Sequence, residues 1–218
     1  MRRLVVTLAL ALQVGAAGAA PMDLPESVRT ALASARAAQK EHRNLDAIES
    51  GRAGIARSIA NPDVRTWHVA PLLRTMAEAY EQAGAMRLAA RAMTIASLAI
   101  QEAPDKHDDL RRWFAAEAAQ KLRRVGALDE ARKQMDYAVR DIVSFVDRAD
   151  KVVRETAIET LLDDVELSLE ANDRRMAQAT LALVRHLMVV HDISELDLLV
   201  WYSQLLERTN DDGIADEQ

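Results

Sequence analysis

The sequence predicts an all-α protein made of about four stacked antiparallel helical hairpins, an α-α superhelix, with a C-terminal capping helix. Half of the residues are apolar, yet only three Trp, three Tyr and two Phe are present. Alanine and leucine, which favour helices, therefore supply the core. No segment alternates apolar and polar residues as a half-buried strand does, and small residues recur at a fixed interval along the chain.

The first segment, residues 1–19, has the pattern of a secretory signal peptide and is excluded from the predicted fold. Two arginines follow the initial methionine, residues 4–14 are apolar, and small residues precede a cleavage site after Ala19. The apolar run is shorter than the roughly 20 residues of a membrane span. We expect export to the periplasm, or secretion, and favour the general secretory route over the twin-arginine route.

Helix-capping and helix-breaking residues divide the segment 20–207 into nine predicted helices. Asn61 and Pro62 predict a helix start, since Asn caps helices and Pro suits their first position. Gly84 and Gly126 predict helix ends, because glycine adopts the left-handed conformation without strain. Pro71 predicts a kink. The predicted helices cover residues 25–41, 44–59, 62–83, 85–102, 106–124, 128–146, 150–170, 173–190 and 194–207.

The connections between these helices are short, which makes sequential neighbours pack as antiparallel hairpins. Residues 20–207 therefore form one predicted helical domain, and the helix 194–207 would cap its open end through its apolar residues. The segment 208–218 is acidic and has no apolar face, so we expect a disordered tail there.

Small residues repeat after 42 positions in the middle of the chain. The pairs are Ala77 and Ala119, Gly84 and Gly126, Ala85 and Ala127, Ala89 and Ala131, Met93 and Met135, and Ala96 and Ala138. A weaker copy follows 46 positions later, with Asn172 in place of Gly126 and Ala177 in place of Ala131. A fourth copy is indicated by Ala47, in the position of Ala89. Repetition at this period indicates stacked helical hairpins.

At these positions the chain resembles the tetratricopeptide repeat (TPR) family, in which small residues lie where the two helices of a hairpin cross. The interval of 42 to 46 residues departs from the family's usual length of about 34. The tryptophan and the terminal proline of the family pattern are not in register. A generic alanine-rich helical bundle, in which the small residues coincide through composition alone, is the alternative.

The resemblance implies a concave groove, lined by the first helices of the hairpins, that binds a protein or peptide. Trp113 is the best candidate anchor, since Trp and Arg dominate binding hot spots, although an ordinary core position is equally consistent with its type. The full set of expected groove residues is Arg74, Glu78, Glu81, Gln82, Trp113, Gln120, Arg123, Arg124, Glu166 and Glu170, with Glu159 as a weaker member.

The sequence offers no strong catalytic or cofactor motif. There is no cysteine, and we find no zinc-type histidine pair, phosphate-binding loop or nucleophile motif. The net charge of −6 disfavours nucleic acid. The sequence therefore predicts an exported periplasmic scaffold or adaptor without enzymatic activity, cofactor or bound metal. The alternative is a helical protein that binds a small ligand or metal through the acidic and histidine residues at 105–109, and an enzyme is less favoured still.

The signal-peptide assignment is tested by the mass of the protein isolated from its native host. We expect the intact mass of a chain that begins at Ala20, because cleavage after Ala19 places small residues where the peptidase requires them. An intact mass that includes residues 1–19 would show that this segment is retained.

Overall fold

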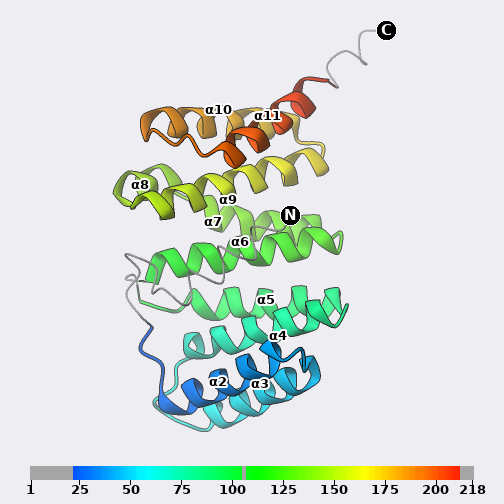
Figure 1. Ribbon diagram of the computed structural model, residues 1–218. Helices are drawn as coiled ribbons and strands as arrows, with labels where there is room; N and C mark the ends of the chain where they lie inside the picture. The colour runs from blue at the N-terminus through cyan, green and yellow to red at the C-terminus, as the bar shows by residue number, and fades with distance from the viewer. Residues whose placement is uncertain (1–21, 105–106, 212–218) are drawn as a thin grey trace. The chain divides into compact units, whose positions relative to one another are not determined.

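The structure is a computed structural model that describes residues 22–104 and 107–211. This part of the chain contains α-helices and one short 3-10 helix, and no strand (Figure 1). Two compact units divide between Glu130 and Ala131, and we call them the first and the second unit. The helices are α2 (Glu26–Lys40), α3 (Asn44–Ile59), η1 (Thr66–Val69), α4 (Ala70–Gln82), α5 (Met86–Ile100), α6 (Asp108–Arg124), α7 (Leu128–Val139), α8 (Ile142–Arg148), α9 (Lys151–Glu170), α10 (Arg174–Val190) and α11 (Leu196–Asp211).

The predicted fold class, an all-α repeat of helix pairs, is confirmed. In the first unit α2 packs against α3, α4 packs against α5, and α5 in turn contacts α6. The helices α2 and α4, which begin successive pairs, also touch each other. In the second unit α9 pairs with α10, and α11 contacts both of them. Within the described residues, none of these helices is long and apolar enough to cross a membrane.

Several helices end at a residue in the left-handed conformation, as predicted for Gly84 and Gly126, whose φ angles are 76° and 77°. The amide of Ala85 donates to the carbonyl of Tyr80 at 2.8 Å, which satisfies a carbonyl that the end of α4 would leave unpaired. Asn172 ends α9 in the same way, with φ at 57°. The turns at Gly84 and Asn172 bring α5 back along α4 and α10 back along α9.

The predicted helix 62–83 is wrong at its beginning. Asn61 caps no helix, because its side chain accepts a hydrogen bond from the amide of Asp63 at 3.0 Å and so closes a turn. The α-helix α4 starts only at Ala70, after the short helix η1. Pro71 therefore lies in the first turn of α4, where proline is tolerated, and the predicted kink is absent.

Two further boundaries differ from the predicted helices. The predicted helix 128–146 is divided into α7 and α8 at Asp141, whose φ of 52° no α-helix accommodates. The last helix, α11, continues to Asp211, so that residues 208–211, expected in the acidic tail, are helical. The rest of that tail, 212–218, and the predicted signal peptide, 1–19, lie outside the described residues.

The repeated small residues lie in the core. Eight alanines occupy equivalent positions of the two strong copies, and two of them, Ala85 and Ala127, lie in turns. The other six are at most 1% exposed, namely Ala77, Ala89, Ala96, Ala119, Ala131 and Ala138. Helix backbones also meet directly where α3 crosses α2: a Cβ atom added to Gly54 would lie 2.5 Å from the Cβ atom of Ala31. Close approach of helices through small side chains is thus a property of the folded chain.

The packing at these positions is tested by a matched pair of substitutions on α10. Ala177 is fully buried and Ala179 is exposed. We expect Ala177→Trp to lower the free energy of unfolding by about 3 kcal/mol, because an indole ring forces the packed helices apart. Ala179→Trp should leave it nearly unchanged. Urea denaturation followed by circular dichroism measures both, and equal stabilities of the two variants would contradict the close packing.

Candidate functional site

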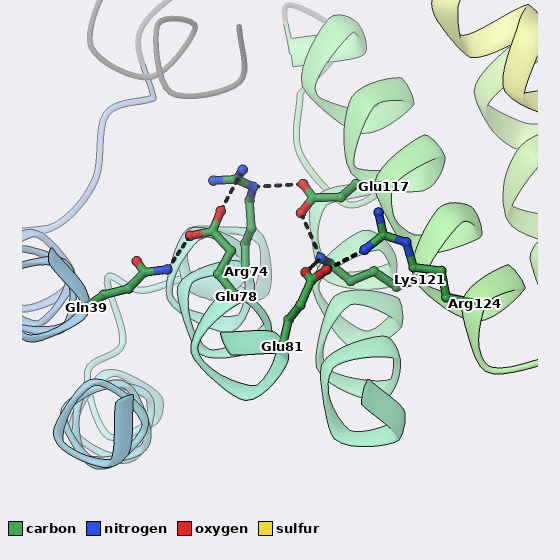
Figure 2. A network of polar contacts seen from close by, with 7 residues as sticks. All are labelled: Gln39, Arg74, Glu78, Glu81, Glu117, Lys121 and Arg124. Carbon is green, nitrogen blue, oxygen red and sulfur yellow. Dashed lines mark hydrogen bonds and ion pairs between the residues drawn. The ribbon is translucent and has the colours of Figure 1, made fainter. Parts of the chain in front are cut away.

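A chain of polar contacts connects α2, α4 and α6 in the first unit (Figure 2). We call it the polar ladder, and its members are Gln39, Arg74, Glu78, Glu81, Glu117, Lys121 and Arg124. The helices α2 and α4 begin successive pairs, and α6 follows α5 in the same alternating order. The ladder is therefore built from the helices on which the sequence analysis expected a binding surface.

Arg74 is the central residue of the ladder. Its Nε donates to Oε2 of Glu117 on α6 at 2.8 Å, and its Nη2 lies 2.7 Å from Oε1 of Glu78 on α4. The side chains of Arg74 and Glu117 are only 7% and 9% exposed, so this ion pair is almost fully removed from water. The guanidinium carbon also lies 4.4 Å from the centroid of the Trp113 ring. Arg74 is thus held by two carboxylates and an aromatic face.

Glu81 receives two cations at the other end of the ladder. Lys121 and Arg124 on α6 both donate to its carboxylate, and Lys121 Nζ is also 3.6 Å from Oε1 of Glu117. Burial alone would raise the pKa of Glu81, but the hydrogen bonds and charges of Lys121 and Arg124 outweigh it and hold the pKa below its ordinary value. Glu81 is therefore ionised at neutral pH and joins α4 to α6.

On the α2 side, the ladder ends at Gln39, whose Nε2 donates to Oε2 of Glu78 at 2.9 Å. Arg36, one turn earlier on α2, is half-buried beside it. Burial lowers the pKa of Arg36, the charge of Arg74 lowers it further, and the charge of Glu78 offsets part of this effect. Among the described residues, Arg36 makes neither a hydrogen bond nor an ion pair with a carboxylate.

The charges of this region do not balance. Its cations are Arg36, Arg74, Lys121 and Arg124, and its carboxylates are Glu78, Glu81 and Glu117, so one positive charge is in excess. Because Arg74, Lys121 and Arg124 already bind carboxylates of the ladder, the excess falls on Arg36. Among these seven groups, Arg36 is the cation without a direct carboxylate contact.

The structure brings four of the predicted groove residues, Arg74, Glu78, Glu81 and Arg124, into the ladder. Trp113 adjoins it: the ring is half-buried against the apolar core of the first unit, and one face meets Arg74. Trp113 thus has features of both an anchor and a core residue.

The other predicted groove residues are not among the seven that form the ladder. Gln82 is exposed at the end of α4, and Gln120 and Arg123 are half-buried on α6. Glu166 and Glu170 belong to α9 in the second unit, together with the weaker candidate Glu159. Glu166 accepts a hydrogen bond from Trp201 Nε1 at 3.0 Å. Burial, and then the charge of Glu155, raise the pKa of Glu159.

Sequence reasoning missed four residues of this region, namely Arg36, Gln39, Glu117 and Lys121. Glu117 and Lys121 are four residues apart, a spacing that places them on one helix face and that the sequence does show. The expected groove positions were placed at equivalent positions of successive repeats, and the ladder residues do not recur in this way. For example, the position equivalent to Lys121 in the preceding repeat, 42 residues earlier, is Ala79. Nothing in the sequence indicated Arg36 or Gln39.

The second unit has a separate polar cluster around Asp164 of α9. Arg132 Nη1 of α7 lies 2.7 Å from Asp164 Oδ1, and Thr180 Oγ1 of α10 donates to Oδ2 at 3.1 Å. Arg132 Nη2 also donates to Ser168 Oγ at 2.9 Å. Burial raises the pKa of Asp164, and the charge of Arg132 opposes that shift. These groups use their hydrogen-bonding capacity on one another. The cluster therefore connects three helices and does not present a binding site.

The acidic and histidine residues at 105–109, the alternative ligand site, are only partly described. Residues 105 and 106 lie outside the described part. His107 is buried, with its ring 5.6 Å from that of Trp67, and Asp108 pairs with Arg112 at 2.9 Å. Within the described residues, no three His, Asp or Glu side chains are grouped as metal ligands.

Comparisons with known proteins place the fold. No protein-family model matches the chain, and no curated protein matches its sequence. A solved structure from Podospora anserina, assigned as a kinesin light chain with nearly identical TPR-like repeats, is similar in three dimensions, with a TM-score of 0.60 at 13% sequence identity. The similarity covers 87% of this chain and 99% of that one. The resemblance seen in the sequence is therefore confirmed: the fold is a TPR-like all-α repeat.

The contribution of the buried Arg74–Glu117 ion pair to stability is tested by replacing its residues with methionine. We expect Arg74→Met to lower the free energy of unfolding by about 3 kcal/mol, because Glu117 then stays buried with only Lys121 nearby. Arg74→Met combined with Glu117→Met should recover most of this loss, since two apolar side chains replace two desolvated charges. Urea denaturation of the three proteins measures the effect. A double variant less stable than the single one would contradict it.

Proposed function

We propose that this protein is an exported, periplasmic adaptor that binds a segment of a partner protein on the polar ladder and catalyses no reaction. The observation that carries the proposal is the ladder itself, which joins α2, α4 and α6 and has one excess cation at Arg36. The TPR-like fold is consistent with a protein partner. Export is supported by the pattern of residues 1–19.

Stability alone does not explain the ladder. Buried ion pairs contribute less than apolar side chains of the same volume, because each charge loses its hydration. Elsewhere the same helices pack through alanines such as Ala77 and Ala119, which carry no such cost. A row of charges in this position therefore supports a role in recognition, for which fixed donors and acceptors reduce the entropy lost on binding.

The partner segment is expected to carry a carboxylate that pairs with Arg36 and polar groups that meet the exposed end of the ladder. Arg124 and the neighbouring Gln82 are accessible there, while Arg74, Glu117 and Lys121 are buried and act by holding the others in place. A charge-assisted hydrogen bond to Arg36 would contribute about 1.5–3 kcal/mol.

The proposal is tested by photo-crosslinking in the native host. A photoreactive amino acid is placed at Gln82, beside the ladder, or at the exposed Ile59 on α3 as a control. We expect an adduct of defined mass from position 82 in the periplasmic fraction, and none of that mass from position 59. Arg36→Met should abolish the adduct, because it removes the excess cation. Arg57→Met, which removes an exposed arginine of α3, should not.

Two outcomes would contradict the proposal. One is an adduct that survives Arg36→Met at its original yield, which would separate binding from the ladder. The other is recovery of the protein from the cytoplasm alone with residues 1–19 intact, which would exclude export. Circular dichroism of the Arg36→Met variant ensures that loss of the adduct reflects binding and not unfolding.

A further inference from the structure

A groove of about 610 Å³ lies between α10 and α11 in the second unit. Its lining residues on α10 occur at positions 178, 181, 182, 185, 186 and 189, and those on α11 at positions 202, 206, 209 and 210. Both sets follow the spacing of a single helix face. Two parallel rows of side chains of this kind form the type of groove that receives a third helix.

The groove is open because α11 has no following helix in the described part of the chain. The earlier helices α2, α4 and α9 each pack against the helix that comes next, whereas the described part of the chain contains no helix after α11. Its apolar residues extend beyond the core: Leu198 and Leu205 are buried, but Leu199 and Leu206 are 41% and 39% exposed. An apolar surface of this kind at the end of a repeat indicates a place for a partner.

The apolar parts of the groove come from both helices. Leu181 lies at its base, Val189 on α10 is 76% exposed, and Tyr202 and Leu206 form the α11 side. Val190 on α10 and Val200 on α11 are also exposed, at 56% and 47%, although neither lines the groove. An apolar helix face inserted between Val189 and Leu206 would cover side chains that now face water.

The charged and titratable side chains that line the groove on α10 are Arg185 and His186, and no carboxylate of the described residues lines it. Among the described residues, neither Arg185 nor His186 forms a hydrogen bond or an ion pair. The chain as a whole has a net charge of −6, so this groove differs in sign from the rest of the protein. The charge complement of Arg185 is a carboxylate.

We propose that the groove between α10 and α11 binds an amphipathic helix of a partner protein, whose carboxylates pair with Arg185. The partner helix completes the pair that α11 begins. Its apolar face lies between Val189 and Leu206, and its acidic border faces Arg185 and His186. The proposal is independent of the polar ladder, because the two surfaces belong to different units and share no residue.

Binding is measured by fluorescence anisotropy, with the full mature chain and two synthetic probes. One probe is a helical peptide with leucines at positions i, i+3, i+4 and i+7 and glutamates between them, and the other has lysines in place of the glutamates. We expect the glutamate probe to bind at least about tenfold more tightly, because only its charges complement Arg185.

Matched variants locate the site. Arg185→Glu and Val189→Asp should each weaken binding of the glutamate probe by about tenfold, through charge and apolar contact respectively. Arg175→Glu, which changes an exposed arginine of α10 outside the groove, and Leu98→Asp, which changes an exposed leucine of α5, should have no effect. Circular dichroism melts verify that each variant is folded.

Three results would overturn the proposal. Equal binding of the two probes, or equal loss in the control variants, would show that the groove does not select an acidic helix. Sedimentation velocity that detects a dimer abolished by Val189→Asp, with no probe binding, would assign the groove to a second copy of this chain. Probe binding that requires removal of residues 212–218 would assign it to the chain's own terminal residues.

Discussion

The structure depends on how closely its helices approach one another. Gly54 has no room for a side chain beside Ala31, and, apart from the turn residues Ala85 and Ala127, the alanines repeated at an interval of 42 residues are almost completely buried. At such positions the backbones themselves form the contact, and added volume moves whole helices instead of single rotamers. The positions of all other side chains, including those of the polar ladder, follow from this spacing.

Short distances between helices explain how charged residues form a ladder. Arg74 reaches Glu117 on α6 and Glu78 on its own helix at the same time, and Gln39 reaches Glu78 from α2. Long side chains at wider separation would lose more conformational entropy and meet only through water. The alanines and the charges therefore belong to one arrangement: small residues set the distance, and charged residues span it.

The fold could be predicted from the sequence because its determinants are local or periodic. Gly84, Gly126 and Asn172 end helices by their own conformational preferences, and the buried alanines recur at a fixed interval. Asn61 could not be interpreted in the same way, because an asparagine side chain can either cap a helix or close a turn, and here it closes a turn. The site was harder to predict, because Arg36 and Lys121 gain their roles from contacts between helices, which follow no sequence period.

The position of α11, the last helix of the described part of the chain, also bears on the dynamics of that part. In repeat proteins each helix is stabilised mainly by its neighbours, so an end that lacks one neighbour opens with a smaller free energy than the interior. Amide hydrogens of α11 would then exchange with solvent before those of α9, and a protease would cut there first. A ligand bound in the groove between α10 and α11 would slow both hydrogen exchange and proteolysis of α11. The extent of protection would increase with the concentration of the ligand.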